Sequence, residues 1–317
     1  MACGVVAYHV PLPGYELHAA DFQRMAGNGL SWVEMDYVWR LIEPQPGVFD
    51  FSYYDAITQA ARAHGLRILA KLGNGYNGNR ATVPDWTVDL DPAGYLQAME
   101  GYIRAVLMRY GDAMAACALE NEANIAAMHA QIGWRVGLWP QERVLAIWKV
   151  MGDLVRQLVP QAPILLSLSG LGPMAAALGH PGIETWLAAA TAAGVPFDQV
   201  GLQTYLCRFF PDQDCYQATA AQVRQLADLA GKPVTILETG LTTTDPHHDE
   251  HSQAAFMERI VQAARDGGAW GLFVYEYLDN PQEPDYPERG FGLVRPDRTP
   301  KPAWTAYGAA IAALLRA

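Results

Sequence analysis

A regular alternation of two kinds of segment is the feature that most constrains how this 317-residue chain can fold. Short runs rich in branched and aromatic residues alternate with longer runs whose apolar residues recur with helical period. Such alternation gives parallel strands joined by crossover helices, and eight units of this kind close a barrel. The expected strands are Gly4–His9, Leu30–Asp36, Arg67–Gly73, Ala115–Leu119, Ile164–Leu168, Gln199–Thr204, Pro233–Glu238 and Gly271–Tyr277.

The expected helices follow these strands, and several of them end at a glycine, as helices tend to do. They are Leu17–Ala26, Tyr54–His64, Pro92–Tyr110, Gln141–Leu158, Ile183–Ala193, Ala218–Ala230, Ser252–Asp266 and Pro302–Arg316. Hydrophobic residues make up 51% of the chain and charged residues 17%, and no stretch has the composition of a linker. We therefore expect residues 1–317 to form one domain, a (β/α)8 TIM barrel of the α/β class.

The charge of the chain narrows the range of partners. Its net charge is −11 and its basic residues are scattered, which disfavours nucleic acid, because phosphate binding needs a concentrated basic surface. A basic start followed by an apolar segment is not seen, nor is a long apolar run, so we expect neither a signal peptide nor a membrane span. The default location is the cytoplasm, or outside the cell if a leader has been removed, and the sequence does not indicate an oligomeric state.

The four cysteines fall into two pairs with different surroundings. Cys3 and Cys117 lie in expected strands, where a cysteine usually behaves as a small buried hydrophobic residue. Cys207 and Cys215 flank a loop, so a disulfide between them is an open alternative, although two free thiols are favoured in a cytoplasmic protein. The spacing of the four suits none of the usual zinc sites.

Two glutamates stand where strand-like runs break into loops. Glu122 lies in Ala118-Leu-Glu-Asn-Glu-Ala-Asn124, and Glu238 lies in Val234-Thr-Ile-Leu-Glu-Thr-Gly240. Because the carboxyl ends of all barrel strands meet at one face, both side chains could serve one pocket. Local sequence alone describes a solvated loop acid equally well. The pair nevertheless predicts an active site with two carboxylates.

A series of motifs runs along nearly the whole chain. The motifs are Trp32-Val-Glu-Met-Asp-Tyr-Val-Trp-Arg-Leu-Ile-Glu-Pro-Gln-Pro-Gly-Val-Phe-Asp-Phe51, Gly65–Ala70, Asn121–Asn124, Gly201–Tyr205, Leu237–Gly240, Val274–Asp279, Gly290–Val294 and Lys301-Pro302. In their order and spacing they resemble the motifs of the clan A glycoside hydrolases. Within that clan, the resemblance is nearest to the xylosidase and iduronidase-type members and their bacterial exopolysaccharide-hydrolase relatives.

The resemblance implies a (β/α)8 barrel that hydrolyses β-linked glycosides with retention and without a cofactor. Glu122 takes the position of the family's acid/base, and Glu238 that of its nucleophile. Double displacement needs two such carboxyl groups about 5–5.5 Å apart. By the same resemblance, Asn121 donates to the sugar 2-hydroxyl and Tyr205 holds the carboxylate of the nucleophile.

Further side chains are expected to contact a carbohydrate substrate. His9, Asn74 and Glu276 end other strands and could bond sugar hydroxyls. Sugar faces stack on aromatic rings, although each such ring could equally pack under a loop. The candidate rings are Trp86, Trp134, Trp139, Phe209, Phe210 and Tyr275, whereas Trp39, Trp148 and Trp304 look structural.

Three residues depart from the family pattern. Clan members often carry Arg near Glu34, Trp at the position of Glu120 and His at the position of Gln203. The two extra carboxylates could recognise substrate, perturb the catalytic pair or be satisfied buried acids, and a shifted register on the second strand would also explain Glu34. These alternatives stay open.

Two other functions remain as alternatives. One is a catalytically inactive carbohydrate-binding barrel, suggested by the departures in the pocket. The other is a metal-dependent hydrolase that uses Asp245-Pro-His-His-Asp-Glu-His251, since His and carboxylates are good ligands. The spacing in this run is not a helical i, i+4 pair, so a solvated loop that caps the following helix is favoured and no metal is expected.

Overall fold

The computed structural model describes residues 1–7, 16–73, 82–125, 140–170, 181–210, 214–281 and 286–316. Its strands form a closed barrel in the order β1 to β8, so the expected fold class is confirmed. Every strand begins and ends within three residues of its expected range. The strands are β1 Ala2–Ala7, β2 Trp32–Tyr37, β3 Arg67–Leu72, β4 Met114–Leu119, β5 Ile164–Ser169, β6 Gln199–Gln203, β7 Val234–Thr239 and β8 Gly271–Val274.

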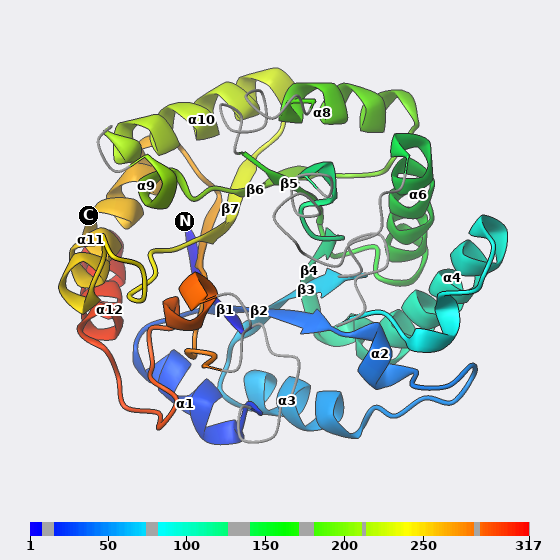
Figure 1. The fold of residues 1–317 in the computed structure, drawn as a ribbon, viewed down its shortest axis with the longest axis horizontal. Coiled ribbons are helices and arrows are strands. Elements are labelled where there is room, and N and C mark those ends of the chain that lie inside the picture. The colour runs from blue at the N-terminus through cyan, green and yellow to red at the C-terminus, as the bar shows by residue number, and fades with distance from the viewer. Residues whose placement is uncertain are drawn as a thin grey trace. The chain divides into compact units, whose positions relative to one another are not determined.

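The helices alternate with the strands along the chain (Figure 1). All eight expected helices are present, and the short α2 and α9 were not predicted. The α-helices are α1 Ala19–Gly27, α2 Trp39–Ile42, α3 Ser52–Ala63, α4 Pro92–Tyr110, α6 Gln141–Leu158, α8 Ile183–Ala192, α9 Leu206–Phe209, α10 Cys215–Ala230, α11 Glu250–Asp266 and α12 Pro302–Arg316. Short 3-10 helices are η1 Asp85–Thr87, η2 Gly111–Ala113, η3 Ala123–Ile125 and η4 Tyr286–Gly290.

Side-chain caps explain why two helices start earlier than expected. The carboxylate of Asp214 accepts a hydrogen bond from the backbone N–H of Gln217 at 3.2 Å, which begins α10. Asp249 and Ser252 form a reciprocal capping box that begins α11, with both hydrogen bonds at 2.8 Å. Such caps satisfy backbone donors that the first turn leaves without partners. Within the described residues, no helix is both long and apolar enough to cross a lipid bilayer.

The chain divides into two compact units. The first comprises Met1–Glu34, Ala60–Arg67 and Leu202–Ala317. In it β7, β8 and β1 pair in parallel, and α11 packs against α10 and α12 (Figure 1). Gly4 on β1 is required by close packing, because a Cβ there would lie 2.6 Å from the ring of Phe273.

The second unit comprises Met35–Gln59 and Ile68–Gly201. Here β3, β4 and β5 pair in parallel, and α4 packs against α6. Its core is aromatic: the rings of Trp39 and Tyr102 stack with centroids 5.2 Å apart, and Trp148 is fully buried. Burial of Trp148, and of Trp304 in the first unit, agrees with the structural positions expected for both.

The structure joins Cys207 and Cys215 in a disulfide, so the preference for free thiols was wrong. The short helix α9 and the start of α10 bring their Cα atoms to 5.0 Å, well within bridging range. The sequence pattern predicted neither α9 nor the first turn of α10, so the closeness of the two cysteines could not be predicted. Cys3 and Cys117 are buried free thiols, as expected, and burial raises the pKa of Cys3 to about 11 and that of Cys117 to about 12.

Candidate active site

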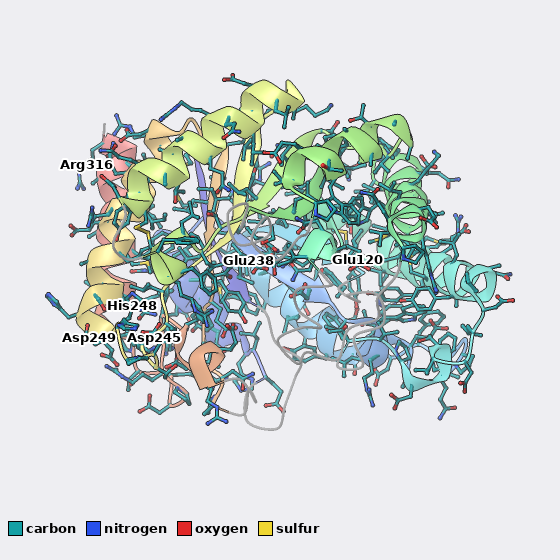
Figure 2. All side chains as sticks on the ribbon, turned by 45° about the horizontal axis from the view of Figure 1, so that its top comes forward. Glu120, Glu238, Asp245, His248, Asp249 and Arg316 are labelled. Atoms are coloured by element: carbon teal, nitrogen blue, oxygen red, sulfur yellow. A yellow bond between two sulfur atoms is a disulfide. The ribbon has the colours of Figure 1, made fainter. Side chains whose placement is uncertain are left out.

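Glu238 lies near the end of β7 as a buried carboxylate with 5% of its surface exposed (Figure 2). Its two oxygens each accept a hydrogen bond from the end of β6. The Tyr205 hydroxyl donates to Oε2 at 3.0 Å, and Nε2 of Gln203 donates to Oε1 at 3.0 Å. The backbone N–H of Thr204 donates to the carbonyl oxygen of Glu238 at 2.8 Å, which fixes the register of the two strand ends. The carboxylate is therefore held in one orientation.

The contact between Tyr205 and Glu238 is the one that the family resemblance implies, while the catalytic role of either residue stays a prediction. Gln203 was noted in the sequence only as a departure from the family pattern. Its position two residues before Tyr205 was the available signal, because side chains two apart on a strand point to the same face.

Tyr205 also belongs to a cluster of three aromatic rings, with Tyr275 and Phe291. Tyr275 packs edge-on against Phe291 with centroids 5.3 Å apart and against Tyr205 at 6.3 Å. Tyr275 is partly exposed, as a sugar-stacking ring must be, and a cis peptide bond joins it to Glu276. Glu276 is 2% exposed. Contact of either side chain with a substrate remains a prediction.

Arg208 in α9 is a further residue beside the cluster that the sequence did not single out. Its guanidinium lies 5.0 Å from the centroid of the Phe291 ring and pairs with Glu288 of η4 at 2.8 Å. Both side chains are largely buried, with exposed fractions of 16% and 15%. The ion pair thus ties the segment after β6 to the segment after β8. Phe209 is exposed and lies under the same guanidinium at 5.0 Å, and Phe210 is half-buried.

The segment after β4 carries Glu120, Asn121 and Glu122, all of them buried. Glu120 and Glu122 both have left-handed backbone conformations, with φ of 56° and 44°. Asn124 anchors the segment, because its side chain donates to the Ser169 carbonyl at 3.0 Å and accepts from the Ser169 N–H at 2.9 Å. The Asn124 side chain thus satisfies both backbone groups of Ser169, and this pair of hydrogen bonds holds the backbone around Glu122 in place.

The burial of the two glutamates argues against solvated loop acids. Glu122 is 8% exposed and Glu238 is 5% exposed. The two extra acids of the family departures are buried as well, Glu34 completely and Glu120 to 5% exposure. Glu120 lies near Gly73, where a Cβ would be 3.7 Å from its Oε1, and near the ring of Tyr95, whose pKa is raised by burial first and by the charge of Glu120 second.

Trp86, a candidate for sugar stacking, has structural contacts. Its indole N–H donates to the Glu43 carbonyl at 3.1 Å, and its ring meets Trp39 edge-on at 5.8 Å. Glu43 in turn accepts hydrogen bonds from the Trp39 indole at 2.7 Å and the Gly47 N–H at 2.8 Å. The acidic-Pro turn after β2 is therefore organised around one carboxylate. The remaining candidates, His9, Asn74, Trp134 and Trp139, lie outside the described residues.

The His-rich run leads into α11, which begins at Glu250 (Figure 2). Nδ1 of His248 lies 2.8 Å from both carboxylate oxygens of Asp245, while Asp249 caps the helix. His248 and Asp245, two of the candidate metal ligands, thus bond each other, and a third, Asp249, accepts a hydrogen bond from the backbone of α11. Within the described ranges, no group of three His, Cys, Asp or Glu side chains is placed to hold a metal ion. The helix-capping interpretation fits these contacts.

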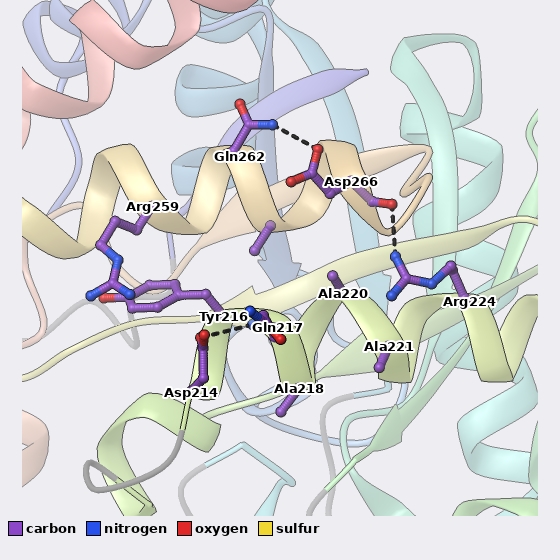
Figure 3. Close-up of a pocket in the computed structure, with 11 residues that line it drawn as sticks. Asp214, Tyr216, Gln217, Ala218, Ala220, Ala221, Arg224, Arg259, Gln262 and Asp266 are labelled. Carbon is purple, nitrogen blue, oxygen red and sulfur yellow. Dashed lines mark hydrogen bonds between the residues drawn. The ribbon is translucent and has the colours of Figure 1, made fainter.

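An open pocket lies between α10 and α11 (Figure 3). The Arg259 guanidinium stacks over the Tyr216 ring at 3.8 Å on one side of it, and Arg224 donates to the Asp266 carbonyl at 2.9 Å on the other. All residues that line the pocket come from these two helices and the cap of α10. None comes from the carboxyl end of a strand, where a barrel builds its chemistry, so we do not assign it to catalysis.

Comparison with known proteins is consistent with the family resemblance. The family model for glycoside hydrolase family 42, described as Beta-galactosidase, matches residues 13–123. A putative mannan endo-1,4-beta-mannosidase 5 of Oryza sativa subsp. japonica is 25% identical over 321 residues, covering 87% of this chain. The structure of GH5_18 from Streptomyces cattleya in complex with GlcNAc has a TM-score of 0.74 at 20% identity, over 93% of this chain. The sequence similarities are thus to glycoside hydrolases, and the structural similarity is to the barrel fold of such enzymes.

Within clan A, the nearer relationship to xylosidase and iduronidase-type members is not established. A family 39 glycoside hydrolase from the gut symbiont Bacteroides cellulosilyticus WH2 has a TM-score of 0.71 at 19% identity, over 98% of this chain and 63% of that chain. Families 5, 39 and 42 are therefore all neighbours. The chain spans 64% of the length of the rice protein, less than two thirds, and 74% of the Streptomyces chain.

Proposed function

We propose that this chain hydrolyses β-linked glycosides with net retention, using Glu238 as nucleophile and Glu122 as acid/base. The observation that carries the proposal is the buried carboxylate of Glu238, whose two oxygens accept hydrogen bonds from Tyr205 and Gln203. A nucleophile must present one oxygen in a fixed direction, and two donors from a single strand end do so. The position of Glu122 directly after β4 in a closed barrel supports the second role.

The reaction proceeds in two displacements. In the first, one oxygen of Glu238 forms a bond to the anomeric carbon as the bond from that carbon to the leaving oxygen breaks. The proton of Glu122 passes to the leaving oxygen. In the second, Glu122 takes a proton from water, the water oxygen bonds to the anomeric carbon, and the ester bond to Glu238 breaks. Two inversions at one carbon return the original β configuration.

The other side chains of the site bind and orient. Tyr205 holds the nucleophile, and Asn121 is proposed to donate to the sugar 2-hydroxyl, a contact that strengthens at the transition state. The partly exposed ring of Tyr275 is proposed to stack on a sugar face, and Glu276 to accept from a hydroxyl. His9, Asn74, Trp134 and Trp139 are proposed to bind substrate, as expected from their positions in the sequence.

The neighbours favour hexose substrates. They include a family described as Beta-galactosidase, a putative mannan endo-1,4-beta-mannosidase and a structure in complex with GlcNAc. We therefore infer a β-hexoside as the first class to test, ahead of β-xylosides.

A panel of nitrophenyl β-glycosides of galactose, mannose, glucose, N-acetylglucosamine and xylose tests the proposal. We expect hydrolysis that persists in a chelator, releases the β anomer first by NMR and disappears in Glu238→Ala. Glu100→Gln, a change in a surface pair on α4, is the matched control and should keep full activity. Binding without turnover across the panel and across β-linked oligosaccharides would favour the inactive barrel, and loss of activity in chelator would favour the metal-dependent hydrolase.

A further inference from the structure

Gln203 makes a contact with Glu238 whose direction is fixed by chemistry. An ionised carboxylate offers only acceptors, so the amide must turn its NH2 group toward Glu238, as it does at 3.0 Å. Gln203 is fully buried on β6, where an amide has few alternative rotamers. The donor therefore stays aimed at Oε1 while Tyr205 occupies Oε2.

The backbone makes this arrangement rigid. The N–H of Thr204 donates to the carbonyl oxygen of Glu238 at 2.8 Å, so the residues that carry both side-chain donors are tied to the main chain of the acceptor. Because Thr204 is bonded to the backbone of Glu238, the neighbouring residues Gln203 and Tyr205 cannot move far from the Glu238 side chain. Gln203 thus meets the geometric demand on a positioning residue, which must hold a reacting group in one orientation.

An amide differs from imidazole in its response to pH. Histidine, which clan members often carry at this position, changes its charge between about pH 5 and 8, whereas an amide stays neutral over that range. A buried neutral donor bonded to Glu238 adds no charge and no ionisation of its own. Any pH dependence of this contact therefore comes from the carboxyl group of Glu238 and not from residue 203.

We propose that Gln203 is a positioning residue that fixes Oε1 of the nucleophile Glu238 with a hydrogen bond from a neutral donor that does not titrate. This inference rests on the proposed function and deepens it. Both donors to the nucleophile then come from one stretch of chain, the amide of Gln203 at the end of β6 and the phenol of Tyr205 two residues later. The pH dependence of the reaction should carry no ionisation from residue 203.

Three substitutions at position 203 test the proposal. Gln203→Leu keeps similar volume and removes the donor; we expect kcat to fall about 10- to 100-fold with a smaller change in KM, as for a lost hydrogen bond to a charged group. Gln203→His should add an ionisation between about pH 5 and 8 to the profile of kcat/KM. Gln203→Glu places a second carboxyl beside the first, and the two compete for one proton, so the acidic limb of the profile should move to higher pH.

Gln199→Leu is the matched control, because Gln199 is a buried glutamine at the opposite end of the same strand. It should leave the pH profile unchanged. If Gln203→Leu fails to fold, the two polar variants still decide the question through their profiles. Profiles of Gln203→His and Gln203→Glu that superimpose on the wild type, with Glu238→Ala inactive, would overturn the role of Gln203 alone. Activity retained in Glu238→Ala would overturn the proposed function itself.

Discussion

Glu120 and Glu122 share a left-handed backbone conformation, with φ of 56° and 44° and Asn121 between them. A residue with a Cβ pays about 1–2 kcal/mol for this conformation, and strain of this kind tends to gather at functional sites. The anchoring of Asn124 to Ser169 nearby shows what holds the segment against that cost. The strain can be measured separately from the chemistry of the carboxyl group.

Glu122→Gly and Glu122→Ala form a matched pair for this purpose. Both remove the carboxyl group, and only alanine keeps the Cβ that opposes positive φ. We expect the glycine variant to be more stable by about 1 kcal/mol in urea unfolding, because glycine adopts this conformation without steric cost. Equal stability of the two variants would mean that residue 122 is not strained.

Tyr205→Phe removes one of the two donors to Glu238 and leaves the ring that packs against Tyr275. We expect kcat to fall about 10- to 100-fold while the fold persists, because a hydrogen bond to a charged acceptor is lost without a cavity. Steady-state kinetics and near-UV circular dichroism measure the two effects. A variant with unchanged kcat would show that Gln203 alone suffices to orient the carboxylate.

The disulfide between Cys207 and Cys215 should stabilise the chain measurably. In the chain-entropy model, a cross-link that closes such a short loop adds about 2.5 kcal/mol to the free energy of unfolding. Reductant should therefore lower the melting temperature. The double variant Cys207→Ser/Cys215→Ser should melt at the lower temperature with or without reductant.

Thiol counting provides an independent check of the same bridge. Burial raises the pKa of Cys3 to about 11 and that of Cys117 to about 12, so neither forms the reactive thiolate readily in the folded chain. We expect almost no thiol to react in native protein prepared without reductant, and two after unfolding. Four reactive thiols after unfolding would contradict the bridge.

Lys301 and Asp279 form a buried ion pair at 2.8 Å, and Lys301 also donates to Thr243 and to the Gly290 carbonyl, each at 3.1 Å. Burial raises the pKa of Asp279 despite the attraction of Lys301, and burial lowers the pKa of Lys301. Lys301→Met should cost about 3–5 kcal/mol, since it leaves a buried carboxylate without its cation.

The sign of the pH dependence follows from the raised pKa of Asp279. In Lys301→Met the folded state holds the proton of Asp279 more tightly than the unfolded state does, so stability is present at low pH and is lost as pH rises through the folded pKa. Urea unfolding should therefore show a larger loss at about pH 8 than at about pH 5. Lys301→Met/Asp279→Leu is the control, and its stability should not carry this dependence.

Sequence patterns were sufficient for the barrel and for the place of its two glutamates, because strand ends follow from where apolar runs break. The starts of helices were harder: residues 245–251 were predicted to cap the following helix, but that helix was expected to begin at Ser252, whereas the capping box of Asp249 with Ser252 begins α11 at Glu250. The positive φ of Glu120 and Glu122 could not be predicted, because this conformation is typical of glycine or asparagine and not of glutamate. The disulfide and the amide of Gln203 depended on distances between segments, which a linear pattern does not contain.

The two carboxylates should respond differently to removal, and this separates their roles. Glu238→Ala eliminates the covalent route and should nearly abolish hydrolysis for every leaving group. Glu122→Ala should spare the first step when the leaving phenolate is acidic enough to depart without a proton. With an activated aryl β-glycoside, Glu122→Ala should accumulate the glycosyl-enzyme, which mass spectrometry would detect as an added sugar mass.

Azide then distinguishes the two positions by stereochemistry. In Glu122→Ala it should attack the glycosyl-enzyme from the face that water would have used and give the β-glycosyl azide. In Glu238→Ala it should occupy the space of the missing carboxylate and give the α-azide directly, because a single displacement inverts the anomeric carbon. An α product from Glu122→Ala would reverse the assignment. Wild-type activity in both variants would place the chemistry elsewhere in the barrel, since neither step of a double displacement can proceed at its normal rate without its carboxyl group.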